Sequence, residues 1–294
     1  MRNAVFYFTG TGNTEFVARE LRAAFGPEHP TELFNIEFLP EQPSAELFAP
    51  FDLLIFGAPV IAFNPPKYFV QFLRRLPEGK GRRAALFLNA GGERWADIGY
   101  ASAILRRRGY NVTSELFFLT VGNMLLRAQN DDTGELYFVL LGWKFRQDSR
   151  GLFAQCQAEV RDFARQLLAG VHHRLRPSPI AQALQTLTRW LFYSLACPTF
   201  KWCVHAQRDC TFCGICVKAC PTANIRLDGK RLGFGTACTV CYRCLNVCPK
   251  QAIRFRWPMG QFGNDVPYLA PGWKPPLHNE RQTVHHTGPT MDRT

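Results

Sequence analysis

The chain has 294 residues, 47% of them apolar, and it carries 35 Lys and Arg residues against 23 Asp and Glu. This composition excludes a disordered chain, and the length predicts one substantial domain and a smaller one. No run of about 18 apolar residues occurs, and an apolar stretch that starts near Met1 leaves no room for a signal peptide. We therefore expect a soluble, cytoplasmic protein without an integral membrane segment.

Short apolar runs alternate with helix-like apolar periods along the first 171 residues. This alternation predicts an α/β domain with a doubly wound, parallel, five-stranded sheet, in which ligands bind where the strand order reverses. The interval 122–150 is an insertion before the last helix, which either covers a cofactor or is a surface loop without such a role. Strands are expected at 3–8, 33–38, 53–57, 84–89 and 112–120, and helices at 16–25, 68–76, 98–108 and 151–171.

Two prolines mark the end of this first domain. Pro177 and Pro179 break a short basic stretch, which predicts a linker. The following helix, 180–196, is too polar to span a bilayer, and we favour packing between domains over contact with a membrane surface. The predicted divisions are 1–171 for the first domain, 172–200 for the linker and its helix, 201–257 for the second domain, and 258–294 for a C-terminal extension and tail.

Nine of the eleven cysteines lie between Cys203 and Cys248, and eight of these form two copies of the run C-x2-C-x2-C-x3-C-P. Two-residue spacers let three thiolates of one turn reach three irons of a 4Fe-4S cluster, and the fourth cysteine reaches the other cluster. Paired structural zinc sites, the alternative, use paired C-x2-C knuckles instead. The expected ligands are Cys210, Cys213, Cys216 and Cys248 for cluster one, and Cys220, Cys238, Cys241 and Cys244 for cluster two.

The positive charge gathers with the cysteines, because residues 197–294 hold 13 Lys and Arg against 5 Asp and Glu. Part of this excess compensates cluster thiolates, and the rest favours acidic redox proteins as partners. Lys218, Arg243 and Lys250 are expected to raise the cluster potentials. Basic residues of the first domain are scattered, so nucleic-acid binding is not expected. Cys197 and Cys203 lie outside both runs and are interpreted as buried or idle thiols, with a ligand or redox role as the alternative.

A loop rich in Thr and Gly separates the first strand from the first helix. Backbone N–H groups and the helix dipole converge there on an anion, hydroxyls add donors, and glycines allow close approach. Neither the lysine of a nucleotide-hydrolysing loop nor the three glycines of a dinucleotide motif are present. The loop therefore predicts a bound, non-reacting phosphate. Its residues are Thr9, Gly10, Thr11, Gly12, Asn13 and Thr14.

This loop resembles the FMN phosphate loop of flavodoxins, which has the form Thr-x-Thr-Gly-x-Thr. In flavodoxin-like proteins, the loops after two later strands hold the isoalloxazine ring. Ile61 stands where an aromatic side chain often stacks on the flavin, and Phe63 or Trp95 either replaces it or packs against its loop. Asn123 resembles a motif near the flavin, with a structural turn as the alternative. The implied contacts are Pro59, Phe63, Asn64, Asn89, Gly91, Gly92, Trp95 and Asn123.

With this loop first and the two cysteine runs last, the chain resembles the flavodoxin-ferredoxin fusion proteins of bacteria and archaea, the EFR-type ferredoxins. The resemblance implies a flavodoxin-like sheet followed by a small α+β domain like a dicluster ferredoxin. It also implies electron exchange among FMN, two 4Fe-4S clusters and external redox partners. Two alternatives stay open: a flavin-dependent reductase of a small substrate, fed by the clusters, and an interaction module that senses iron or oxygen. No catalytic acid, base or nucleophile is singled out.

Overall fold

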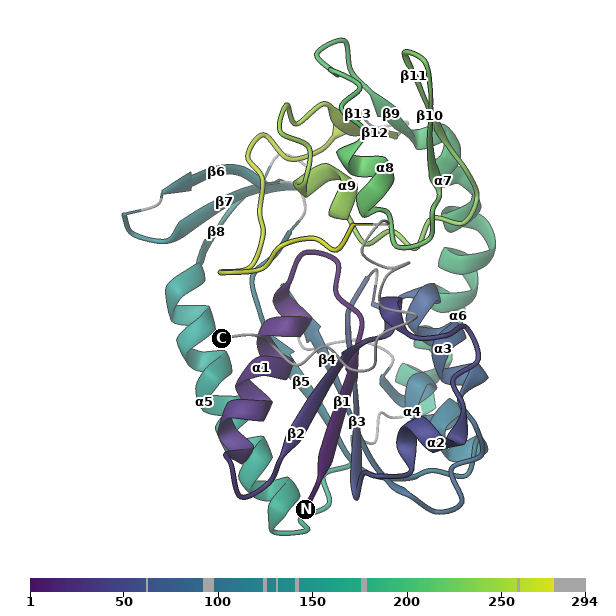
Figure 1. Cartoon of the computed structure of the whole chain (residues 1–294). Helices are drawn as coiled ribbons and strands as arrows, with labels where there is room; N and C mark the ends of the chain where they lie inside the picture. The colour runs from purple at the N-terminus through teal and green to yellow at the C-terminus, as the bar shows by residue number, and fades with distance from the viewer. Residues whose placement is uncertain are drawn as a thin grey trace.

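The structure is a computed structural model that describes residues 1–61, 63–91, 98–123, 126–130, 132–140, 143–175, 179–257 and 260–277. A five-stranded parallel sheet with the order β2-β1-β3-β4-β5 forms its centre (Figure 1). Because the order reverses between β1 and β3, the loops that follow these strands open at one edge. This arrangement confirms the flavodoxin-like α/β fold. The strands are β1 Asn3–Tyr7, β2 Thr31–Asn35, β3 Leu53–Pro59, β4 Arg83–Ala90 and β5 Asn111–Leu119.

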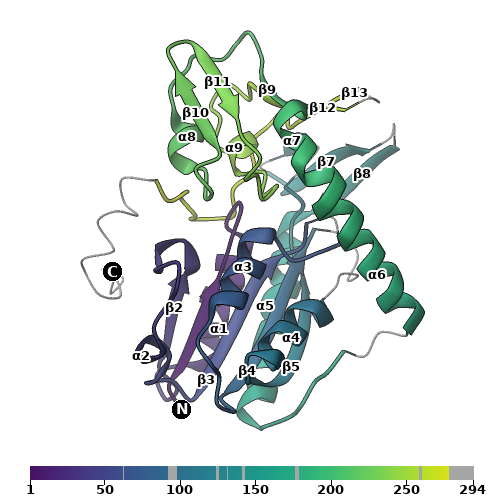
Figure 2. The same ribbon diagram turned by 90° about the vertical axis from the view of Figure 1, so that its right-hand side faces the viewer.

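Helices cover both faces of this sheet (Figure 2). The apolar residues of α1 and α5 form one buried cluster with the sheet, and those of α3 and α4 belong to the cluster on the opposite face. On α5 the buried face contains Cys156, Val160, Phe163 and Leu167, and Cys156 is fully enclosed. The helices are α1 Asn13–Phe25, α2 Ala45–Phe48, α3 Lys67–Arg75, α4 Ile98–Arg107 and α5 Ser149–Leu168.

The second strand is shorter than the apolar run 33–38 predicted. It ends at Asn35, whose side-chain oxygen accepts a hydrogen bond of 3.0 Å from the N–H of Glu37. This contact satisfies an N–H group at the start of a short 3-10 helix, η1 Ile36–Phe38. As a result Glu37 turns toward the interior, where only 5% of the residue is exposed.

The insertion before α5 forms an antiparallel sheet of three strands, with the order β6-β7-β8. Its residues Leu126 and Leu136 are buried with Val121, which follows β5, and with Tyr268 of the C-terminal extension. The insertion is therefore an ordered part of the molecule that the extension packs against. The strands are β6 Leu126–Asn130, β7 Glu135–Leu140 and β8 Trp143–Asp148.

A long helical segment leads from the first domain into the second. It consists of α6 Pro179–Leu191, a wide π-helical turn η2 Phe192–Ala196, and α7 Cys197–Cys203. In the part of the chain that the structure describes, no helix combines the length and the apolar character needed to cross a membrane.

The second domain is small and mixes short helices with short strands. One sheet has the order β13-β12-β9, and a hairpin pairs β10 with β11. Two short helices, α8 and α9, each follow the first two cysteines of one run and contain the third. The elements are β9 Val204–Ala206, α8 Ile215–Ala219, β10 Ile225–Asp228, β11 Arg231–Phe234, α9 Arg243–Asn246, β12 Ile253–Trp257 and β13 Gly260–Phe262.

Replacing Phe163 on α5 by alanine should destabilise the first domain. Its ring is 1% exposed and meets the ring of Phe118 edge-on at 5.9 Å, so Phe163→Ala leaves a cavity beside the sheet. We expect the free energy of unfolding to fall by about 3–5 kcal/mol, measured by anaerobic urea unfolding. Arg161→Ala, at an exposed position of the same helix, should change it by less than about 0.5 kcal/mol. Equal losses in both variants would contradict this packing.

Candidate functional site

The eight cysteines of the two runs gather into two groups of four. In the first group, burial and, to a smaller extent, the neighbouring Cys248, Cys210 and Cys213 together raise the pKa of the Cys216 thiol to about 12. The same four residues line one cavity of the second domain. Cys213 is exposed, so this group reaches the molecular surface.

The second group consists of Cys220, Cys238, Cys241 and Cys244. Burial raises the pKa of Cys241 to about 12, which Arg243 opposes and which Cys220 and Cys238 reinforce. Burial and the same three cysteines raise the pKa of Cys244. Across the described ranges no three His, Cys, Asp or Glu side chains converge on a single metal ion. The grouping matches the expected ligand sets, in which the last cysteine of each run crosses over, while ligation itself stays a prediction.

Both cysteine runs fold with the same local geometry. Phe212 and Val240 stand at matching positions and have left-handed φ values of 55° and 57°. That conformation is costly for a β-branched residue such as valine, so the surrounding turn must enforce it. The N–H four residues after the last cysteine of each run donates to that cysteine's sulfur, from Asn224 at 3.3 Å and from Ala252 at 3.2 Å. Such N–H donors stabilise thiolates and tune cluster potentials.

A cavity lies at the edge of the sheet where β1, β3, β4 and β5 end. Loops of the first domain line it on one side, and Cys241 and Tyr242 of the second cysteine run line it on the other. Among the residues that the structure describes, none that lines this cavity is charged. The predicted contacts among them are Thr9, Gly10, Thr11, Asn13, Thr14, Pro59, Asn89, Gly91 and Asn123.

Hydrogen bonds connect the polar groups around this cavity. The Thr14 hydroxyl donates to Asn89 Oδ1 at 2.7 Å, and Asn123 Nδ2 donates to the Thr11 hydroxyl at 3.0 Å. Asn13 Nδ2 donates to a backbone carbonyl after β5 at 2.7 Å. Hydroxyl and amide groups next to the N–H groups of the first turn of α1 form an uncharged donor set, which fits the phosphate and polar edge of a flavin nucleotide.

Other predicted contacts do not line the cavity. Gly12 has φ of 99° and lies under the C-terminal extension, where an added Cβ would come within 2.6 Å of a tryptophan side chain. Phe63, at φ 64°, leaves 48% of its surface exposed, and Asn64 is fully buried. Gly92 and Trp95 lie outside the described residues. Ile61, at the position expected near the flavin ring, and Cys241, an expected cluster ligand, also line the cavity. Further lining residues that the sequence did not predict are Val60, Ala90, Thr120, Val121, Gly122 and Tyr242.

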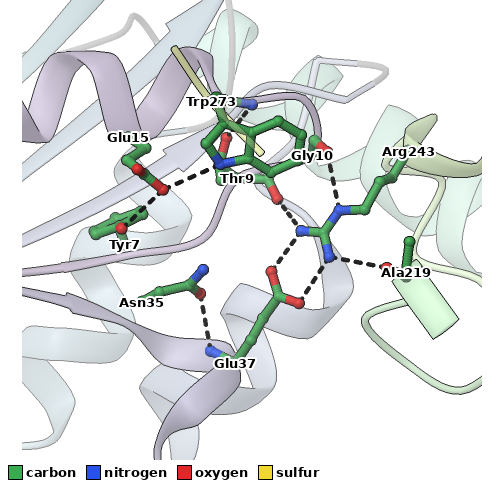
Figure 3. Close-up of polar contacts among 10 residues, drawn as sticks. Tyr7, Thr9, Gly10, Glu15, Asn35, Glu37, Ala219, Arg243 and Trp273 are labelled. Atoms are coloured by element: carbon green, nitrogen blue, oxygen red, sulfur yellow. Dashed lines mark hydrogen bonds and ion pairs between the residues drawn. The ribbon is translucent and has the colours of Figure 1, made fainter. Parts of the chain in front are cut away.

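A buried ion pair joins the two domains beside this cavity (Figure 3). Arg243, inside the second cysteine run, meets Glu37 with Nη2–Oε1 and Nη1–Oε2 distances of 2.5 and 2.8 Å, and both side chains are 0% exposed. Burial lowers the pKa of Arg243, but the Glu37 carboxylate more than reverses this and holds it above the ordinary value. The same guanidinium donates to the carbonyls of Thr9 at 2.6 Å, Gly10 at 3.0 Å and Ala219 at 3.0 Å.

This pair gives Arg243 a role that the sequence did not predict, as a connector between the two domains. The effect of Arg243, Lys218 and Lys250 on the cluster potentials stays a prediction, and Arg243 does act on the second group because its charge lowers the pKa of Cys241. The sequence did contain a signal, because Glu37 is the one acidic residue of the otherwise uncharged run 33–38. An acid in such a run requires a partner when it is buried.

The C-terminal extension lies across the phosphate loop. The Tyr268 hydroxyl donates to Asn13 Oδ1 at 2.5 Å, and the Ala270 N–H donates to the Thr11 carbonyl at 2.8 Å. The indole N–H of Trp273 donates at 3.1 Å to a glutamate in the first turn of α1 (Figure 3). Residues 260–277 therefore brace the loop from the side opposite the sheet.

Residues 209–253 match the family model of the 4Fe-4S dicluster domain, so the second domain is of the kind that carries two 4Fe-4S clusters. No curated protein matches the chain. Among solved structures, a flavodoxin from the domain Archaea is 12% identical, with 57% of this chain and 99% of that one covered and a TM-score of 0.35.

Two other solved structures are similar to part of this chain. A short-chain flavodoxin associated with a non-canonical PDU bacterial microcompartment is 14% identical, with 58% and 99% covered and a TM-score of 0.39. The flavodoxin of Megasphaera elsdenii in its two-electron reduced form is 24% identical, with 40% and 85% covered and a TM-score of 0.32. The flavodoxin-like fold of this chain is defined by its own strand order.

Removing the carboxylate of Glu37 should uncouple the two domains. Glu37→Gln leaves the Arg243 guanidinium buried without a counter-charge, which costs about 3–5 kcal/mol of folding stability. We expect the midpoint of unfolding to move to a lower urea concentration, measured under anaerobic conditions. The control is Glu32→Gln, which removes a partner of Arg2 at the surface and should cost less than about 1 kcal/mol. A Glu37→Gln variant as stable as this control would contradict the role of the pair.

Serine substitutions can test the crossed ligand sets. Cys220→Ser and Cys241→Ser should each disrupt cluster two, reduce the iron content from about eight to about four atoms, and leave the same residual cluster spectrum. Cys248→Ser and Cys213→Ser should each disrupt cluster one instead, so that the residual spectrum of both variants is that of cluster two. Iron analysis and EPR of anaerobic samples measure this, with Cys203→Ser as the thiol control. A residual spectrum of Cys220→Ser that matches that of Cys213→Ser would overturn the crossing.

Proposed function

We propose that the protein is an electron-transfer protein of the EFR-type flavodoxin-ferredoxin fusion family. It binds FMN in the first domain and passes electrons among FMN, the two 4Fe-4S clusters and external redox partners. The proposal rests on one cavity, which is lined by the phosphate loop and strand ends of the first domain together with Cys241 and Tyr242 of the second.

Bound FMN supplies the exchange of one or two electrons, while each 4Fe-4S cluster exchanges one. The residues of the chain bind and orient the cofactor. Hydroxyls of Thr9, Thr11 and Thr14 and the first turn of α1 would hold the phosphate. The strand ends at Pro59 and Asn89 would flank the ring system, because both line the same cavity. The second domain contributes Cys241 and Tyr242 to the same cavity and would shield part of the bound cofactor from solvent.

Cluster two is the natural electron neighbour of the flavin. An added Cβ on Gly10 would come within 2.4 Å of the Cys241 carbonyl oxygen, so the second cysteine run lies directly on the phosphate loop. The two cysteine groups also adjoin, because Cys216 of the first group contributes to the raised pKa of Cys244 in the second. The resulting order is cluster one, cluster two, FMN.

Cluster one would be the point of contact with redox proteins. Cys213 of its group is exposed, and basic side chains surround that end of the second domain. On the β10–β11 hairpin, Arg226, Lys230 and Arg231 are exposed. Lys250 is also exposed and lines the cavity of the first cysteine group. This charge would attract and orient acidic partner surfaces and speed their association.

Anaerobic purification with iron and flavin analysis tests the proposal first. We expect about eight iron atoms and one FMN for each chain. Stepwise reduction followed by EPR and optical spectra should then show that cluster and flavin signals change together. Zinc in place of iron, a preparation that binds no flavin on reconstitution, or clusters that are reduced while the flavin stays oxidised would refute it. Turnover of a small oxidised substrate would favour a flavin-dependent reductase instead.

The phosphate-loop hydroxyls should contribute measurably to FMN affinity. Thr11→Val and Thr14→Val keep the side-chain shape but remove one hydrogen-bonding group each, which is worth about 0.5–1.5 kcal/mol or roughly a two- to tenfold higher Kd. The quenching of FMN fluorescence on titration into the flavin-free protein measures this. Thr133→Val, in the exposed turn between β6 and β7, is the matched control. An unchanged Kd in both loop variants would remove these hydroxyls from the site.

A further inference from the structure

The helix that links the domains exposes a continuous apolar stripe. Ile180, Leu184, Leu187 and Leu191 follow one another at intervals of three or four residues, so they share one face of α6. All are solvent-exposed, Ile180 by 81% and Leu187 by 51% of its surface. Leu195 continues the exposed apolar surface into the π-helical turn. We call these five residues the apolar stripe.

The opposite face of the same helix is anchored on the first domain. Gln185 is 4% exposed, and the Arg189 guanidinium lies 3.8 Å from the centre of the Tyr100 ring. The Tyr193 hydroxyl donates to the carbonyl of Pro65. These contacts with the first domain involve the face of α6 opposite the apolar stripe. Figure 2 shows α6 and α7 along the outer edge of the molecule. The apolar stripe is an additional feature that this packing does not explain.

The chain segment that contains the apolar stripe is basic. From Phe163 to Arg208 the sequence contains six Lys and Arg residues and no Asp or Glu. Of these, Arg174 and Arg208 are exposed, whereas Arg165 pairs with Asp162 and Arg189 packs on Tyr100. Two tryptophans in this segment, Trp190 and Trp202, are 57% and 71% exposed, and the Lys201 ammonium lies 4.2 Å from the Trp202 ring.

These features together match the chemistry of a bilayer interface. Leucine and isoleucine side chains enter the boundary of the acyl chains, indole rings favour the headgroup level, and lysine and arginine reach acidic headgroups. A protruding helix on the edge of the molecule also suits a flat, fluid surface, which needs no groove of matching shape. The lack of acidic residues supplies charge complementarity to an anionic surface.

We propose that α6 and α7 form a peripheral docking helix for anionic membrane surfaces. The apolar stripe enters the interface with the helix parallel to the membrane, and the neighbouring basic side chains contact acidic headgroups. Because the opposite face is anchored on the first domain and α7 leads directly into β9 of the second, docking holds both domains at the surface.

Sedimentation with vesicles tests this on the anaerobically purified holoprotein. We expect binding to vesicles of equal parts phosphatidylglycerol and phosphatidylcholine, and little binding to phosphatidylcholine alone. Leu187→Ser and Leu191→Ser should each weaken binding about tenfold or more, because a fully buried leucine contributes at least that factor. Leu227→Ser, on β10 and also exposed, is the matched control and should bind as the wild type does. Unchanged cluster absorbance verifies that each variant is folded.

Several results would overturn the proposal. These are no binding to anionic vesicles, equal binding to both vesicle types, or stripe variants that bind as tightly as the wild type. A concentration-dependent dimer in sedimentation velocity, lost in Leu187→Ser and not accompanied by vesicle binding, would instead assign the apolar stripe to contact between two copies of the chain. An interaction with a partner protein without vesicle binding would refute it in the same way.

Discussion

The buried ion pair between Glu37 and Arg243 is the contact on which the arrangement of the two domains depends. Removing two charges from water is costly, and the cost is offset only when the charges meet in good geometry and their remaining groups are hydrogen-bonded. Here Arg243 meets both conditions, because it also donates to the carbonyls of Thr9 and Gly10 and thereby holds the phosphate loop. Neither domain can bury its half of the pair alone.

This constraint couples the cofactor sites to one another. Arg243 lies between Cys241 and Cys244, so its position depends on the fold of the second cysteine run, which metal binding stabilises. The same residue holds two carbonyls of the loop that we propose binds the FMN phosphate. Assembly of cluster two and completion of the proposed flavin site would therefore be parts of one process. The extension makes a further contact with the loop, from Tyr268 to Asn13.

We propose two separate binding regions on the outer surface, one for redox proteins and one for a membrane. Basic side chains around the exposed Cys213 would receive acidic redox partners, whereas the apolar stripe on α6 would contact an anionic membrane. Because the two regions use different elements, the chain can be held at a surface while cluster one stays accessible. The interior contacts between the domains are separate from both regions.

The spacing of residues that are close together in the sequence was sufficient to predict the main sheet and the cofactor motifs. The alternation of strands and helices predicted the sheet, and the two cysteine runs and the loop from Thr9 to Thr14 predicted the cofactor class, because each depends on residues close together in the chain. The tertiary structure alone decided the rest. Glu37 and Arg243 are 206 positions apart. Their pairing, like the placement of Cys241 on the cavity between the domains, depends on how the two domains dock. The 3.6-residue period of α6 likewise indicated an amphipathic helix, but only packing decided which face stays uncovered.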